Sequence, residues 1–132
     1  MCDYSSYINK LAILPQEIFL FEDSVKENII FGREYDSKEL ETLLHRLEIE
    51  KFSDRDMAEL SGGERKRVGL SRAFLGFHNV LILDEPTSDV DMEMEKKMVE
   101  LIDEYITKKN GILVVITHRP EILKICNKIL QL

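Results

Sequence analysis

The stretch VLILDE, residues 80–85, decides how this chain folds. Four aliphatic residues stand between Asn79 and a pair of carboxylates that Pro86 follows, which is typical of a parallel strand covered on both faces. Asp84 and Glu85 leave the carboxyl end of that strand. Ligands bind at this edge in open α/β sheets, so the pair predicts a metal ligand beside a general base or a water-orienting group. A solvated strand end would have the same pattern.

Length and composition describe one acidic domain. The 132 residues suit one domain with a buried core, and 18 basic against 25 acidic side chains give a net charge of −7. This charge argues against nonspecific nucleic-acid binding, so no nucleic-acid partner is expected. Cys2 and Cys126 have neither disulfide-framework nor metal-site spacing, which favours a reduced cytosolic setting. Without a leader pattern or a run of ~18 apolar residues, no direct membrane insertion is expected.

Two other apolar runs are predicted to be strands of the same sheet. Residues 8–14 form a short run, and Gln16 lies just past its end. Residues 112–117, ILVVIT, are predicted to be a second fully buried strand, which His118 ends. Carboxyl ends of parallel strands share one edge, so Gln16 and His118 are expected beside the acid pair. A lone histidine at a strand end is often structural, but its alignment with the acids favours a functional role.

Helical periodicity fills most of the remaining sequence. The predicted elements are a helix with an apolar stripe at Leu40, Leu43, Leu44 and Leu47, a helix from Glu64, a long helix over residues 92–109, a short helix from Pro120 and the start of a strand at residues 128–132. The alternation predicts an α/β fold with a three-layer parallel sheet. We expect one domain over residues 1–132, with a helical subdomain at about residues 21–76 inserted in it.

The sequence LSGGE, residues 60–64, places a serine and two glycines directly before a helix. Free backbone N–H groups and the positive end of the helix dipole favour a phosphate or another anion there. Ser61 and Glu64 also have the spacing of a capping box, which needs no ligand, and both features can coexist. The basic residues at 65–67 and 72 are predicted to form a solvated face, with phosphate steering as the alternative.

The order of these motifs resembles the nucleotide-binding domain of ABC transporters, from Ile8 over nearly the whole chain. The counterparts of the Q-loop, signature, Walker B strand, D-loop and H-loop are LPQE (14–17), LSGGE (60–64), LILDEP (81–86), TSDVD (87–91) and ITH (116–118). Residues 16–32 are similar to exporters in which the ATPase is fused to membrane helices. Chromosome ATPases of the SMC and Rad50 type share a signature-like element, but this sequence has no sustained heptads for their coiled coil.

The resemblance implies a P-loop NTPase-like parallel sheet that uses ATP and Mg²⁺. Carried onto the matching positions, Glu85 would polarise the attacking water and Asp84 would hold Mg²⁺ through its shell. Gln16 would contact the metal and the water, and His118 would contact the γ-phosphate. These roles agree with phosphoryl transfer, in which a protein positions groups and stabilises charge.

The resemblance also implies partners. In family dimers the signature faces the nucleotide of the opposite subunit, so Ser61, Gly62 and Gly63 would bind the ATP of a second nucleotide-binding domain that carries Walker A. Asp91 would lie in the dimer contact. The other partner would be the membrane domain of a transporter. The chain would then be cytoplasmic, peripheral to the membrane, and would energise export by ATP hydrolysis.

The sequence lacks the Walker A element of the family pattern, the strand before it and the aromatic residue that would stack on adenine. No G-x-x-x-x-G-K-S/T occurs, and the six glycines cannot build one, so the chain resembles an incomplete domain without its Walker A strand. The family places that strand beside the one that ends at His118. An exposed edge is therefore expected at residues 112–117 unless residues 128–132 or another chain cover it. We expect weak nucleotide binding and no appreciable ATP hydrolysis by the isolated chain.

Two classes of function stay open on the sequence. The first is an ATPase-family module, either a piece of a transporter ATPase or a half-site chain that offers its signature to a partner with Walker A. The second is a noncatalytic or regulatory fragment that docks onto a complete ABC ATPase. A nonfunctional remnant is the third possibility.

Overall fold

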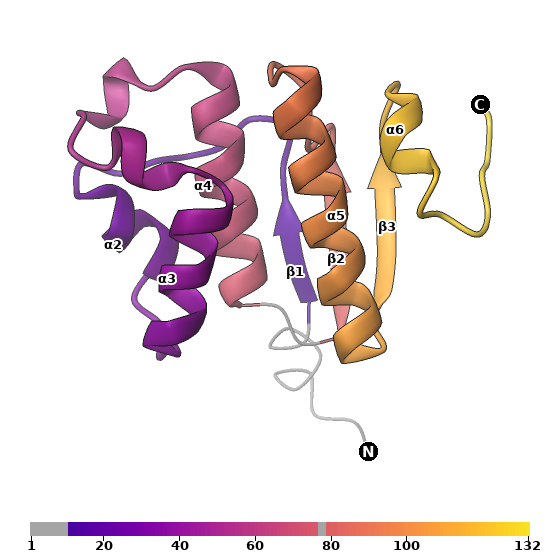
Figure 1. The fold of residues 1–132 in the computed structure, drawn as a ribbon, viewed down its shortest axis with the longest axis horizontal. Helices are drawn as coiled ribbons and strands as arrows, with labels where there is room; N and C mark the ends of the chain where they lie inside the picture. The colour runs from indigo at the N-terminus through magenta and orange to yellow at the C-terminus, as the bar shows by residue number, and fades with distance from the viewer. Residues whose placement is uncertain (1–10, 77–78) are drawn as a thin grey trace.

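Three strands in the described part of the chain form one parallel sheet in the order β1-β2-β3 (Figure 1). The computed structural model describes residues 11–76 and 79–132. The strands are β1, Leu11–Leu14, β2, Val80–Asp84, and β3, Ile112–Ile116. Leu14 pairs with Leu83 and Asp84 pairs with Ile116, so the strands end at one edge. The predicted α/β class with a parallel sheet is confirmed; residues 8–10 of the first predicted strand lie outside the described residues.

Most of the described α-helices begin where the sequence supplies a capping side chain. They are α2, Val25–Ile30, α3, Ser37–Arg46, α4, Gly62–Leu75, α5, Met92–Lys109, and α6, Pro120–Leu123, with short 3-10 helices at Ile49–Phe52 and Met57–Glu59. The side chains of Ser24, Asp36 and Asp91 accept hydrogen bonds from first-turn N–H groups of α2, α3 and α5. Asn110, in the left-handed conformation with φ 48°, ends α5.

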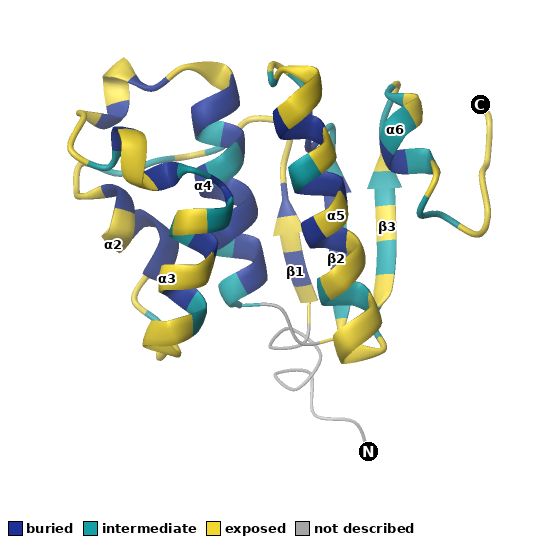
Figure 2. Ribbon diagram, in the orientation of Figure 1, coloured by how far each residue is buried: buried dark blue, intermediate teal, exposed yellow. Residues whose placement is uncertain are grey.

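One face of the sheet carries the core. The buried positions of β1 and β2 alternate with more exposed ones, and α5 lies across this face (Figures 1 and 2). The side chains that meet there are Ala12, Leu14, Leu81 and Leu83 from the sheet, and Met98, Leu101 and Ile102 from α5. Each large aliphatic side chain buried in this way contributes roughly 1.5–3 kcal/mol.

The opposite face of the sheet is open in the described part of the chain. Five of its aliphatic side chains are 40% to 62% exposed: Leu11, Ile13, Ile112, Val114 and Ile116. β3 alternates between exposed and half-buried residues. The prediction that β2 and β3 are covered on both faces of a three-layer sheet is therefore wrong for the described residues. An apolar run shows which surface suits burial, but it does not supply the layer that would bury it.

Residues 128–132 do not form the predicted strand. Ile129 and Leu130 are 60% and 91% exposed. After α6 the chain turns away from the sheet (Figure 1), and among the described residues β3 pairs only with β2. The expected exposed edge of β3 is thus confirmed there. A strand forms only where its backbone groups find partners, and apolar composition does not decide that.

Helices α2, α3 and α4 follow β1 in the chain and pack together to one side of the sheet (Figure 1). The predicted apolar stripe of α3 is confirmed at Leu40 and Leu43, which are 1% and 0% exposed. Arg72 of α4 donates from Nε to the carbonyl of Asn28 at 2.8 Å, which ties α4 to α2. The prediction that Arg72 lies on a solvated face is wrong, because its guanidinium lies between two helices and donates a hydrogen bond to a backbone carbonyl. The subdomain boundary at residues 21–76 stays a prediction.

Candidate functional site

The ends of the three strands bring the predicted edge residues together. Gln16 lies two residues past β1, Glu85 directly follows β2, and His118 lies two residues past β3. Asp84 is the last residue of β2, is half-buried, and pairs in register with Ile116. The N–H of Glu85 donates to the carbonyl of Ile116 at 2.8 Å, so the turn after β2 is fixed to β3. All four predicted residues therefore stand on one rim of the sheet.

Glu85 has an uncommon backbone conformation. Its φ is 48°, in the left-handed region that residues with a Cβ avoid. Such residues cost of order 1–3 kcal/mol and are concentrated at functional sites. Its carbonyl accepts hydrogen bonds from the Ser88 hydroxyl at 3.0 Å and the Ser88 N–H at 3.3 Å, which hold the turn in this conformation.

The side chains of Glu85 and His118 contact each other directly at the rim. Nδ1 of His118 lies 2.5 Å from Oε1 of Glu85. The glutamate side chain is 13% exposed, whereas the histidine side chain is 96% exposed. The carboxylate and Nδ1 share one hydrogen in this contact, and the rest of the imidazole ring is exposed to solvent. The pair combines a sheltered carboxylate with an imidazole that is open to an incoming group.

Lys66 is a residue of the rim that the sequence prediction missed. Its side chain is buried, and Nζ donates to the carbonyl of Gln16 at 2.7 Å. Burial lowers the pKa of Lys66, against the opposing effect of the nearby Asp89, Asp84 and Glu85 carboxylates. The predicted solvated position is wrong. Helical spacing was the available signal, because Lys66 precedes three buried residues of α4 by three, four and seven positions: Gly69, Leu70 and Ala73.

The capping box predicted at the start of α4 is confirmed. The hydroxyl of Ser61 accepts from the N–H of Glu64 at 3.1 Å, and Oε1 of Glu64 accepts from the N–H of Ser61 at 2.9 Å. Arg55 pairs with the same carboxylate at 2.9 Å. Burial opposes the ionisation of Glu64, but the Ser61 N–H and the charge of Arg55 leave its pKa below the usual value. The anion-binding role of Ser61, Gly62 and Gly63 stays a prediction.

Residues 61–63 and Asp91 form a second group, where the start of α4 approaches the loop of residues 87–91. A Cβ on Gly63 would lie 2.6 Å from the carbonyl oxygen of Asp89, so α4 and this loop approach closely because the residue is glycine. Ser61, Gly63, Asp89 and Asp91 share the lining of a pocket of about 330 Å³ with Arg67 and Lys51. Asp91 also caps α5 through the N–H of Met94, at 2.8 Å.

The rim suits Mg²⁺ only as part of a larger shell. Asp84 and Gln16, the predicted metal residues, provide one carboxylate and one amide at the same edge. Within residues 11–76 and 79–132, no three His, Cys, Asp or Glu side chains gather as a metal cluster. Mg²⁺ commonly takes one or two carboxylates and completes its shell with water and substrate phosphates. These residues therefore fit a metal that arrives with a phosphate ligand.

A parallel sheet with an acid pair and a histidine at its carboxyl edge is typical of α/β proteins that bind their ligands at the ends of the strands. The sequence profile of the family described as ABC transporter matches residues 3–88, more than half of the chain. The chain therefore belongs to the ABC transporter family, as an exporter-like part of a nucleotide-binding domain.

Its relatives are longer proteins. The chain is 34% identical over 134 residues to the ATP-dependent lipid A-core flippase of Vibrio vulnificus (strain CMCP6), which covers 92% of this chain and 23% of that protein. It is 28% identical over 124 residues to the glutathione/L-cysteine transport system ATP-binding/permease protein CydC of Haemophilus influenzae, covering 84% and 21%. An ABC transporter ATP-binding protein homolog of Mycoplasma pneumoniae is 30% identical over 111 residues, covering 84% and 39%. The chain thus spans 21% to 39% of these relatives.

The fold is also similar to a solved structure, that of a bacterial Atm1-family ABC exporter with ATP bound. The TM-score is 0.79 at 25% sequence identity, covering 90% of this chain and 23% of that one. The predicted fold class, an incomplete P-loop NTPase-like sheet with helices inserted, is confirmed by this similarity. Among the helices described here, none is both long and apolar enough to span a membrane.

Proposed function

We propose that this chain supplies part of the ATP-hydrolysing machinery of an exporter-type ABC transporter. The observation that carries the proposal is the hydrogen bond between Glu85 and His118, on the rim where Asp84 and Gln16 also stand. A carboxylate and an imidazole held together at a strand edge suit the handling of a water molecule and a phosphate oxygen. Phosphoryl transfer to water requires both.

Each rim residue has a proposed task. Glu85 orients the attacking water, and His118 presents Nε2 to the γ-phosphate of ATP. Asp84 and Gln16 bind Mg²⁺ together with its water shell. When bound, the metal would neutralise charge that develops on the transferred phosphoryl group. Lys66 supports the site by holding the backbone of Gln16 against α4.

The second group of residues is proposed to act on a partner. Ser61 and Gly62 are exposed at the start of α4, where first-turn N–H groups favour a phosphate. With Gly63, they would bind the ATP of a second nucleotide-binding domain that carries the G-x-x-x-x-G-K-S/T loop. Asp91, in the same pocket lining, would lie in the contact between the two domains. The assembly would dock on a transporter membrane domain at the cytoplasmic face of the membrane.

The separation of the two groups favours one alternative. Ser61, Gly63 and Asp91 line their own pocket, and neither Glu85 nor His118 is part of that lining. A noncatalytic half-site or regulatory fragment, which docks onto a complete ABC ATPase through its signature residues, would need only the second group.

Sedimentation of the chain with a complete exporter nucleotide-binding domain tests the proposal. ATP is expected to bring the two proteins into a complex, while the chain alone releases no phosphate above background. Ser61→Arg is expected to abolish the complex because the new side chain fills the anion-binding turn. Ser37→Arg, at the first position of α3, is the matched control and leaves the complex intact. Absence of an ATP-dependent complex would contradict the proposal.

A substitution at Glu85 separates the two candidate functions. If the chain hydrolyses ATP once a partner supplies the phosphate loop, Glu85→Gln lowers phosphate release by the mixture and preserves the complex. If the chain serves only as a half-site, Glu85→Gln leaves phosphate release unchanged. Ser61→Arg lowers it in both cases.

A further inference from the structure

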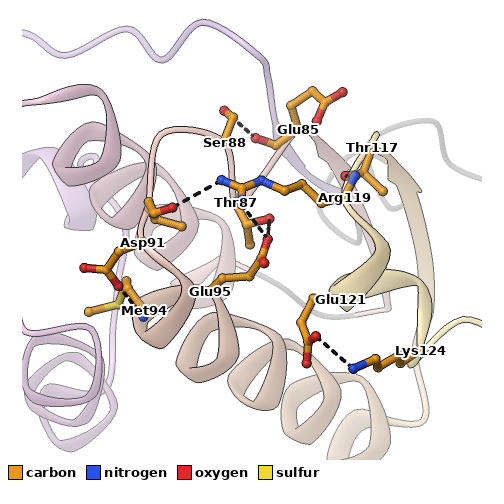
Figure 3. Close-up of polar contacts among 11 residues, drawn as sticks. Glu85, Thr87, Ser88, Asp91, Met94, Glu95, Thr117, Arg119, Glu121 and Lys124 are labelled. Carbon is orange, nitrogen blue, oxygen red and sulfur yellow. Dashed lines mark hydrogen bonds and ion pairs between the residues drawn. The ribbon is translucent and has the colours of Figure 1, made fainter.

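Glu95 is a buried carboxylate that the proposed reaction does not use. It stands in the first turn of α5 and is 6% exposed. Its Oε2 accepts a hydrogen bond from the hydroxyl of Thr87 at 2.8 Å and lies 3.5 Å from Nη1 of Arg119 (Figure 3). Thr87 is fully buried. A buried charge is strongly unfavourable unless it is paired and hydrogen-bonded, and here both partners come from other segments of the chain.

Arg119 connects that carboxylate to two loops. Its Nη2 donates to the carbonyl of Val90 at 3.2 Å, inside the loop of residues 87–91 (Figure 3). Its backbone N–H donates to the hydroxyl of Thr117 at 2.9 Å, which shapes the turn after β3. The planar guanidinium presents donors in fixed directions, so one side chain satisfies Glu95 and Val90 together. A lysine has one ammonium group and would not span both acceptors in this way.

The contacts of Glu95 join the segments that carry the Glu85–His118 pair. Thr87 lies two residues after Glu85, and Arg119 directly follows His118. The imidazole of His118 is 96% exposed, so packing does not hold it in place. Its position depends on the turn of residues 117–119 and on the carboxylate that it meets. Because both segments are tied to one buried carboxylate, displacing it moves the two partners relative to each other.

We propose that Glu95 and Arg119 are positioning residues that hold His118 against Glu85. The ion pair joins the loop of residues 87–91 to the turn after β3, in addition to the backbone hydrogen bond between Glu85 and Ile116. The importance of this geometry for hydrolysis rests on the proposed function. The geometry itself does not depend on that function, and it can be measured without nucleotide.

The test is the nitrogen chemical shift of the His118 ring in the isotope-labelled full chain at constant pH, assigned with His118→Gln. Glu85→Ala removes the hydrogen-bond acceptor and defines the fully displaced shift. Arg119→Lys and Glu95→Gln are expected to move the His118 signal at least half of that displacement. The ring signals of His45 serve as the internal reference.

A matched control is available at the short helix α6, which follows Arg119. Lys124, which directly follows α6, pairs with Glu121 of that helix at 2.9 Å, in an exposed ion pair that touches neither loop (Figure 3). Lys124→Ala is expected to leave the His118 shift unchanged. If Glu95 and Arg119 contributed only to stability, their variants would unfold more readily, but the His118 ring signal of the folded variants would stay at its wild-type position.

The proposal is overturned if Arg119→Lys and Arg119→Gln both leave the His118 signal at its wild-type position while Glu85→Ala displaces it. Arg119 is one-third exposed, so these variants carry the test even if Glu95→Gln does not fold. The outcome is independent of partner binding. An unchanged shift beside intact ATP-dependent complex formation would refute the positioning role alone, and the reverse result would refute the proposed function alone.

Discussion

Single charged side chains on α4 are matched to specific partners within the fold. The carboxylate of Glu64 accepts a hydrogen bond from the Ser61 N–H and forms an ion pair with Arg55. The ammonium of Lys66 donates a hydrogen bond to the carbonyl of Gln16. Removing one member of such a pair leaves the other desolvated, which costs more than the net value of the contact. These residues therefore report on local geometry more sensitively than their exposed neighbours.

Glu64→Gln is expected to weaken the acid dependence of stability. The lowered pKa of Glu64 means that its stabilising effect is fully present above the ordinary glutamate pKa of about 4.3 and is lost as pH falls through the lower folded value. Urea unfolding at neutral pH and below about pH 4 measures the difference. The variant should lose less stability on acidification than wild type. An identical loss would contradict the assigned role of the capping carboxylate.

Tyr105 gives a prediction at the alkaline end. Burial raises its pKa, with a further contribution from Glu39, which accepts a hydrogen bond from the phenol at 3.0 Å. The neutral phenol therefore stabilises the fold fully below about pH 10, and this stability is lost as pH rises through the raised pKa. Tyr105→Phe should flatten the decline in urea midpoint above about pH 10. Its cost at neutral pH is about 1 kcal/mol, one hydrogen bond. An unchanged alkaline decline in Tyr105→Phe would refute the assignment.

At the scale of elements, α4 and the loop of residues 87–91 are held in close approach by two glycines. The hypothetical Cβ of Gly63 meets backbone, whereas that of Gly62 would lie 2.9 Å from the carboxylate oxygen of Asp89, a side-chain atom that can rotate away. The signature turn thus combines a capping box, which fixes the helix start, with glycines, which fix the neighbouring loop.

Gly63→Ala should destabilise the protein by about 1–3 kcal/mol, the usual cost of overpacking. The added methyl group would lie 2.6 Å from the carbonyl oxygen of Asp89, so the loop must move. Gly62→Ala is the matched control and should cost less, because only a side chain has to shift. Urea unfolding of both variants measures the difference, and equal costs would show that the backbone contact does not govern the approach.

At the scale of the whole molecule, the sheet has one covered and one open aliphatic face. The exposed aliphatic side chains of the open face come from β1 and β3, including Ile13 at 55% and Val114 at 46% exposure. The adjacent edge of β3 also carries backbone groups without a strand partner among the described residues. Contiguous apolar patches and unpaired edges favour association, so solution behaviour should be governed by this side of the molecule.

We expect this face to bind an apolar dye such as anilinonaphthalene sulfonate and to drive concentration-dependent association. Lysine at Ile13 and Val114 should lower both dye fluorescence and light scattering, since it places charge in the centre of the patch. Met92→Lys is the matched control, because Met92 is 74% exposed but lies on α5, away from the open face. Equal effects of both sets would mean that general charge, and not this face, controls association.

The local features of this protein follow from short stretches of its sequence. The acid pair at the end of residues 80–83, the position of Gln16 and His118 past their strands, the α3 stripe and the Ser61–Glu64 cap all depend on short-range periodicity and hydrogen bonds. Parallel pairing then brings strand ends to one rim without further information. These features were predictable because each is fixed within a few residues along the chain.

Which surfaces meet depends on contacts between segments that are distant in the sequence. Lys66 reaches Gln16 across 50 positions, and Arg119 meets Glu95 and Val90 from a segment far along the chain. Likewise, the sequence predicts a fully buried strand at β3, which alternates between exposed and half-buried residues, and the start of a strand at residues 128–132, which do not form one. Burial depends on the partner surface that the fold brings to a residue. The same aliphatic run is therefore core on one side of this sheet and open surface on the other.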